Sequence, residues 1–124
     1  VPDNFLFVTG KDGSEEIKLT DWEYAGMQDP HLDVAMFIIY AMYDRDSAEK
    51  LIDLYFSDGC DKATRLKIYC YIAVSGLVWS NWCEFKRHCG VEFGAYAQRQ
   101  YDYAREYTKI FFKEYREAFG RDYV

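Results

Sequence analysis

Two oxygen-bearing side chains, Asn4 and Asp21, lie at the two ends of a short segment whose pattern is typical of a β-hairpin. Apolar runs precede and follow a polar turn at Lys11–Gly13, and two such runs around a turn predict antiparallel strands. If Val8 pairs with Ile17, Asn4 falls opposite Asp21 at the open end of the hairpin. An amide oxygen and a carboxylate at one point suit Mg²⁺ on a nucleotide phosphate, because Mg²⁺ prefers oxygen ligands. The segment therefore predicts half of a phosphoryl-transfer site.

A second group of residues is aromatic. Trp79 and Trp82 are three residues apart in a segment predicted to be helical, so their indoles project from one face. Phe93 and Tyr96 begin the next predicted helix, and antiparallel neighbouring helices bring the two pairs together if the loop at 87–91 is tight. Quaternary ammonium groups accept no hydrogen bonds and are bound by aromatic faces. Core packing is the competing interpretation, since large aromatic side chains commonly fill helical domains.

Both groups match motifs of the choline/ethanolamine kinases, and the chain resembles the C-terminal lobe of that family. The wider family is that of kinase-like small-molecule phosphotransferases, which includes the aminoglycoside kinases. Val1-Pro2-Asp3-Asn4 matches the last four positions of the catalytic loop His-x-Asp-x-x-x-x-Asn, and Asp21 in Asp-Trp-Glu-Tyr matches the second metal-binding Asp. The Trp-x-x-Trp pair and the segment 92–98 match the walls of the family's choline pocket.

The resemblance implies a fold, a domain and a reaction. The fold expected is mainly α, a protein-kinase-like C-lobe fragment with one β-hairpin followed by about four helices. Residues 1–124 are expected to be the substrate- and Mg²⁺-binding lobe, with the N-lobe upstream and the catalytic Asp two residues before Val1. The intact parent is expected to transfer a phosphoryl group from ATP to choline, giving phosphocholine, and the fragment alone is expected to be inactive.

The resemblance also assigns roles to individual residues. Asn4 and Asp21 are expected to bind Mg²⁺, while Asp33 is expected to support the structure as part of an Asp-x-Ala motif. Glu23 is expected to form a salt bridge rather than a metal contact. The residues expected to contact choline are Tyr24, Trp79, Trp82, Phe93 and Tyr96, with Tyr40 or Tyr43 as further candidates.

Three alternatives stay open on the sequence alone. Ethanolamine lacks the three methyl groups of choline, and its ammonium would favour hydrogen-bond acceptors such as Glu92. An aminoglycoside kinase would share the metal-binding hairpin but would favour a pocket rich in carboxylates. A catalytically silent kinase relative or a helical interaction module is the non-enzymatic alternative.

Helical periodicity and capping residues predict four helices after the hairpin. The second is predicted to be capped by Ser47 and the third by Asp61, and Gly120 is predicted to end the fourth. The predicted helices run from near Pro30 to about Tyr43, from Ser47 to 57–59, from about Asp61 towards Lys86, and from about Phe93 to Phe119.

Composition limits the classes of protein that fit. The chain has 124 residues, of which half are apolar and 19% aromatic, so it can bury one compact core. A net charge of −6 argues against nucleic-acid binding, which requires a basic face. The apolar stretch Ile68–Trp79 is too short to insert in a membrane, since a span needs roughly 20 residues. Four cysteines without a Cys-x-x-Cys pair favour reduced thiols in the cytoplasm over zinc. The oligomeric state, including a homodimer, is not decided.

Overall fold

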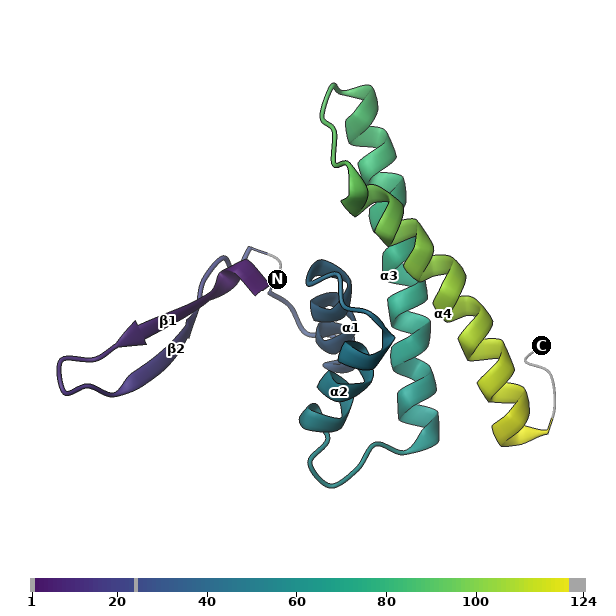
Figure 1. Cartoon of the computed structure of the whole chain (residues 1–124), viewed down its shortest axis with the longest axis horizontal. Helices are drawn as coiled ribbons and strands as arrows, with labels where there is room; N and C mark the ends of the chain where they lie inside the picture. The colour runs from purple at the N-terminus through teal and green to yellow at the C-terminus, as the bar shows by residue number, and fades with distance from the viewer. Residues whose placement is uncertain (1, 24, 121–124) are drawn as a thin grey trace.

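The computed structural model describes residues 2–23 and 25–120 of the chain. The predicted mainly helical fold with one hairpin and four helices is confirmed (Figure 1). The elements, in order, are a short 3₁₀ helix η1 (Pro2–Asn4), β1 (Phe5–Thr9), β2 (Glu15–Leu19), α1 (His31–Tyr40), α2 (Arg45–Tyr55), α3 (Lys62–His88) and α4 (Ala95–Phe119).

Strands β1 and β2 form the predicted antiparallel hairpin, but the predicted register is wrong by one residue. Ile17 pairs with Phe7 rather than with Val8, and Val8 pairs with Glu16. The turn closes through backbone bonds from the Gly10 amide to the Ser14 carbonyl and from the Gly13 amide to the Gly10 carbonyl. The connection between paired residues is therefore one residue shorter than predicted, and every strand pair is shifted by one position.

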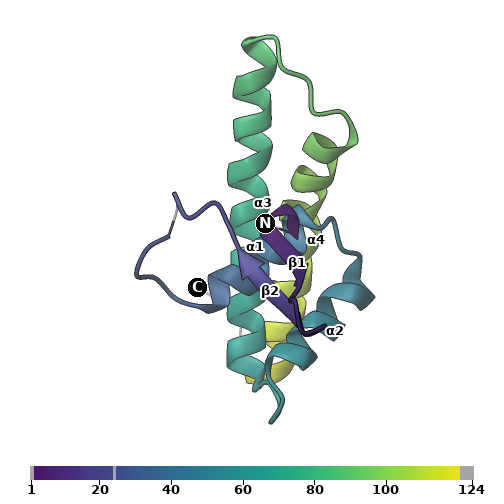
Figure 2. The ribbon, with the colours of Figure 1, turned by 90° about the vertical axis from the view of Figure 1, so that its left-hand side faces the viewer.

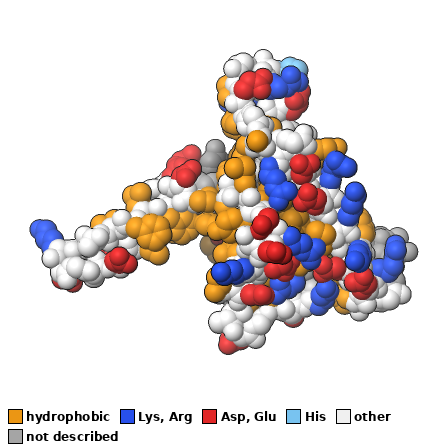
Figure 3. All heavy atoms as spheres, in the orientation of Figure 1, with side chains coloured by type: hydrophobic (Ala, Val, Ile, Leu, Met, Phe, Trp, Pro, Cys, Tyr) orange, Lys and Arg blue, Asp and Glu red, His pale blue; other side chains and the backbone are white. Residues whose placement is uncertain are grey.

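The hairpin projects away from the helices (Figure 1), and in Figure 2, which is viewed from that side, it lies in front of them. All ten strand residues are exposed, and Phe7 is the most exposed of its apolar side chains, at 81%. Apolar side chains follow the hairpin along much of its length on the face drawn in Figure 3. Phe5, at its base, packs edge-to-face on Phe37 of α1 with ring centroids 5.6 Å apart. The hairpin is therefore anchored to the helical body at its open end.

Helices α1 and α2 begin with side chains that accept backbone N–H groups. Asp29 accepts from the His31 amide at the start of α1. At the start of α2 the N-cap is Asp44, whose carboxylate accepts from the Ser47 amide at 2.9 Å. The prediction of Ser47 as the cap is therefore wrong: Asp44 begins the helix three residues earlier, and Ser47 supplies the donor.

Helices α3 and α4 form a long antiparallel pair (Figure 1). The predicted cap of α3 is confirmed, because the Asp61 carboxylate accepts from the Thr64 amide at 2.9 Å. The predicted end of α4 at Gly120 is also confirmed. Gly76 of α3 faces α4 at close range, since a Cβ placed there would lie 2.7 Å from the Gln100 carbonyl oxygen. A side chain at position 76 would therefore separate the pair.

The core lies where α1, α2, α3 and α4 meet, and its largest members include tyrosines. Ile38 of α1, Ile52 of α2, Tyr69 of α3 and Tyr107 of α4 are all buried. No helix in the described ranges 2–23 and 25–120 is long and apolar enough to cross a membrane. The cysteines are free, and Cys83 is the buried one.

Candidate functional site

Side chains of α4 donate hydrogen bonds to one carbonyl near the end of α1 and to one in the turn that follows this helix. The buried Gln100 amide donates to the Ile39 carbonyl at 2.9 Å. The Tyr103 hydroxyl donates to the Tyr43 carbonyl at 2.5 Å, and the Arg99 guanidinium donates to the same carbonyl at 3.0 Å. The Ile39 carbonyl also accepts from the Met42 amide at 3.3 Å, so the Gln100 bond adds to the backbone bond that closes the helix. The side-chain bonds from α4 hold the C-terminal end of α1 firmly against α4.

That end of α1 carries Tyr40, which completes a circuit of five aromatic rings. Trp79 and Trp82 pack edge-to-face with centroids 5.2 Å apart, and Trp82 lies 5.1 Å from Phe93. Phe93 is 6.3 Å from Tyr96, Tyr96 is 6.4 Å from Tyr40, and Tyr40 is 5.3 Å from Trp79. These five residues are called the aromatic circuit below. The structure thus brings together all four ring residues of the predicted pocket that lie in α3 and around the start of α4.

The backbone before α4 has the conformation that this circuit requires. Gly94 has φ 52° and ψ −130°, a combination that side-chain-bearing residues strongly disfavour. It lies between Phe93 and the first residue of α4, so it directs Phe93 back towards Trp82. Burial raises the pKa of the Tyr96 hydroxyl further above physiological pH, where a tyrosine is already neutral.

The electron-rich faces of the circuit already hold one cation. The Lys86 ammonium lies over the Trp82 ring, 5.5 Å from its centroid. This distance is within the ~6 Å at which a cation is attracted to an aromatic face. Lys86 was not among the predicted site residues, although its position one helical turn after Trp82 is a signal visible in the sequence.

The two predicted metal ligands lie at the open end of the hairpin, without the predicted pairing. Because of the register, Asn4 lies opposite Thr20, whose amide donates to the Asn4 carbonyl at 3.0 Å. Asp21 follows, exposed and in the left-handed region with φ 65°. The prediction that Asn4 pairs directly with Asp21 is therefore wrong. The observed partner, Thr20, is the residue directly before Asp21.

A second carboxyl group accompanies Asp21. A hydrogen bond with Asp21 and the negative charge of its carboxylate raise the pKa of Glu23. The described residues contain no group of three or more His, Cys, Asp or Glu side chains that could hold a metal ion. The donors present, carboxylate and amide oxygens, are nevertheless those that Mg²⁺ favours when water and phosphate complete its shell.

The remaining predicted site residues lie outside the aromatic circuit or outside the described residues. Asp33 lies in the first turn of α1, where a carboxylate meets the positive end of the helix dipole. Tyr24 lies outside the described residues. Tyr43, the alternative to Tyr40, packs on Phe37 at 6.0 Å.

An anchoring residue that the sequence did not reveal is Asp29. Its carboxylate accepts from Lys67 at 2.7 Å and from Tyr71 at 3.1 Å, both on α3. The hydrogen bond from Lys67 contributes most to lowering the pKa of Asp29 to about 2, followed by the backbone hydrogen bond from His31. Asp29 thereby joins the segment after the hairpin to α3. No local pattern marks partners 38 and 42 residues away.

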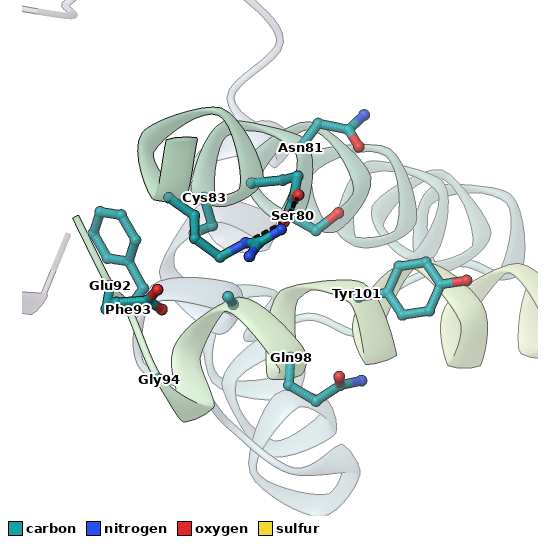
Figure 4. A pocket seen from close by; sticks show the side chains of 11 residues that line it. Ser80, Asn81, Cys83, Glu92, Phe93, Gly94, Gln98 and Tyr101 are labelled. Carbon is teal, nitrogen blue, oxygen red and sulfur yellow. Dashed lines mark hydrogen bonds and ion pairs between the residues drawn. The ribbon is translucent and has the colours of Figure 1, made fainter. Parts of the chain in front are cut away.

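A separate open hollow of about 410 Å³ lies between α3 and the start of α4 (Figure 4). Polar side chains provide much of its lining, including the ion pair of Arg87 with Glu84 at 2.6 Å. Phe93 borders both this hollow and the aromatic circuit, but Trp79 and Trp82 do not line the hollow. The hollow and the circuit are therefore distinct features.

Comparison with known proteins identifies relatives that are similar to this chain in sequence. The chain is similar to Protein LicA of Haemophilus influenzae, in two sequences of that name, one of them from the Rd strain. Each is 28% identical over 116 residues, which cover 84% of this chain. The chain spans only 39% and 31% of the length of these relatives. No family model matches, and no solved structure matches.

Proposed function

We propose that this chain is the substrate- and Mg²⁺-binding part of an ATP-dependent kinase that phosphorylates the hydroxyl group of choline. The observation that carries the proposal is the aromatic circuit of Tyr40, Trp79, Trp82, Phe93 and Tyr96. The distant similarity to Protein LicA and the resemblance to choline/ethanolamine kinases support it.

The chemistry of the circuit favours a methylated cation. A trimethylammonium group has no N–H to donate, so aromatic faces are its natural partners, each contributing about 0.5–2 kcal/mol. The neutral phenol of Tyr96 adds an aromatic face without a phenolate charge. Ethanolamine would lose hydrogen bonds to water at such a surface, since its ammonium group needs acceptors. The proposal therefore ranks choline above ethanolamine and above aminoglycosides.

The open end of the hairpin provides the second half of the proposed site. Asn4 and Asp21 would hold Mg²⁺ through oxygen atoms, and Glu23 lies close enough to Asp21 to share a hydrogen bond with it. Bound Mg²⁺ supplies neutralisation of the charge on the ATP phosphates. The aromatic circuit would hold the ammonium end of choline and orient its hydroxyl group. The resemblance to choline/ethanolamine kinases implies that an Asp two residues before Val1 would accept the hydroxyl proton, and the proposal includes this role.

Helix α1 links the two halves of the proposed site. Phe37 on α1 contacts Phe5 at the base of the hairpin, and Tyr40, three residues later, contacts Trp79. Residues three apart share a helix face, so one short helix touches both the hairpin and the aromatic circuit. A bound amino alcohol would thus be positioned relative to the hairpin by α1.

The test is Mg²⁺-dependent ATP consumption by the intact parent protein with choline, ethanolamine and an aminoglycoside side by side. Asp21→Asn serves as the blank. We expect turnover on choline above that on the other two amines, and loss of this turnover in Asp21→Asn. Turnover on none of the amines, or equal turnover in the variant, would overturn the proposal.

A further inference from the structure

The ammonium group of Lys86 lies over one face of the Trp82 ring. The two residues are four apart on α3, so their side chains lie on one face of the helix. The ammonium group lies 5.5 Å from the centroid of the Trp82 ring, and Lys86 is half-buried. Trp82 itself is 38% exposed, so solvent or a ligand can still reach it. The contact joins a positive charge to the aromatic circuit before any ligand is bound.

The end of the helix alone does not explain this position. Lys86, Arg87 and His88 all lie in the last turn of α3, where positive charge is favourable. The side chains of Arg87 and His88 contact the Glu84 carboxylate, with nitrogen–oxygen distances of 2.6 Å and 3.3 Å. Within ranges 2–23 and 25–120 no carboxylate forms an ion pair with Lys86, whose ammonium lies on the indole instead. The contact with Trp82 is therefore a separate interaction of this one lysine.

We propose that Lys86 is an internal competitor for the cation site of the aromatic circuit and thereby sets its affinity for quaternary ammonium ligands. The inference rests on the proposed function, because it assigns a regulator to the same site. Two positive charges at one aromatic face repel each other, so a bound ligand requires the ammonium of Lys86 to move away. The long, flexible lysine side chain allows this movement without a change in the backbone.

The competition predicts how ligands are discriminated. Every cation must displace Lys86, whereas an uncharged molecule of the same shape does not meet its repulsion. Removing the charge of Lys86 should therefore strengthen binding of cations and leave binding of their neutral analogues almost unchanged. A lysine that only packs against the indole would affect both kinds of ligand alike.

The experiment is calorimetric titration of the full-length protein with tetramethylammonium chloride at constant ionic strength. The variants are Lys86→Met, which keeps the length of the side chain without its charge, and Lys86→Arg, which keeps the charge. Lys50→Met, at an exposed position of α2, is the matched control. We expect Lys86→Met to bind roughly three- to tenfold more tightly, from the size of one exposed cation–π contact and its repulsion. Lys86→Arg and Lys50→Met should match the wild type.

A double-mutant cycle assigns the effect to Trp82. In a Trp82→Ala background, Lys86→Met should no longer change the affinity, because the shared aromatic face is gone. Equal or weaker binding by Lys86→Met, or no binding by any variant, overturns the inference. Choline turnover without an effect of Lys86→Met would leave the kinase proposal standing and remove the competitor. If Lys86→Met changes the affinity but the protein does not turn over choline, the competitor role of Lys86 stands and the kinase proposal falls.

Discussion

Asp21 and Trp82 have different roles in the proposed site. Single substitutions at the two positions distinguish these roles. Asp21 is exposed at the end of the hairpin, outside the helical core, so its carboxylate contributes little to packing. Trp82 contacts Trp79, Phe93 and Lys86 and belongs to the aromatic circuit. The first residue should therefore affect the rate of phosphoryl transfer, and the second should affect the binding of the amine.

Asp21→Asn should lower kcat of the parent protein at least about 100-fold, since a lost metal ligand removes several kcal/mol of charge stabilisation. Asparagine tolerates the left-handed conformation at φ 65°, so the backbone should be preserved. Steady-state kinetics at saturating choline measure the effect, and circular dichroism checks the fold. Asp58→Asn, on the exposed loop after α2, is the control. A kcat within a factor of two of the wild type would contradict the metal assignment.

At the scale of elements, local signals predicted most of the fold. The cap of α3 at Asp61 and the end of α4 at Gly120 were predicted because capping depends on residues within one turn. The hairpin register was not predicted correctly, because the strands are exposed on both faces and no buried face fixes their pairing. The cap of α2 was predicted at Ser47 and lies at Asp44; both residue types suit an N-cap, so residue type alone does not distinguish the two positions.

The approach of α3 and α4 is the element-scale feature most open to a stability test. Gly76→Ala would place a Cβ 2.7 Å from the Gln100 carbonyl oxygen and 3.0 Å from the Tyr103 Cβ. Because backbone must move, we expect the free energy of unfolding to fall by about 1–3 kcal/mol. Urea denaturation measures the change. Val74→Ala, at a site 59% exposed on the same helix, should change it by less than about 0.5 kcal/mol. Equal stability of the wild type and Gly76→Ala would disprove the close approach.

At the scale of the whole molecule, contacts between distant segments bring the residues of the proposed site together, and these contacts were the least predictable feature. The convergence of Trp79, Trp82, Phe93 and Tyr96 was expected from the helix pair α3 and α4. Tyr40 was only one of two candidates on the predicted first helix, because its place depends on how α4 holds the end of α1. The ionic links that join α2, α3 and α4, such as Glu114 with Arg45 and Lys62, leave no local pattern either.

The link between Asp29 and α3 predicts a dependence of stability on pH. The pKa of Asp29 is lowered from 3.8 to about 2 in the folded chain, so its ionised form stabilises the fold. This stabilisation is complete above the unfolded-state pKa of 3.8 and is lost as pH falls through about 2.

Asp29→Asn should therefore reduce stability at neutral pH and flatten the fall in stability as pH drops from about 4 to about 2. Urea unfolding at several pH values in this window measures both effects. Lys67→Met, which removes the main cause of the shift, should flatten the same window. A fall as steep in Asp29→Asn as in the wild type would exclude Asp29 as its source.

The most direct test of the account compares choline with 3,3-dimethylbutan-1-ol, its uncharged analogue of the same shape. Initial rates of ATP consumption by the parent protein give kcat/KM for both alcohols in the wild type, Trp82→Phe and Trp82→Ala. We predict that the wild type prefers choline and that Trp82→Ala loses roughly 2- to 30-fold of this preference, mainly through KM, with Trp82→Phe between them. An unchanged preference in Trp82→Ala would contradict the claim that the aromatic circuit binds the cation.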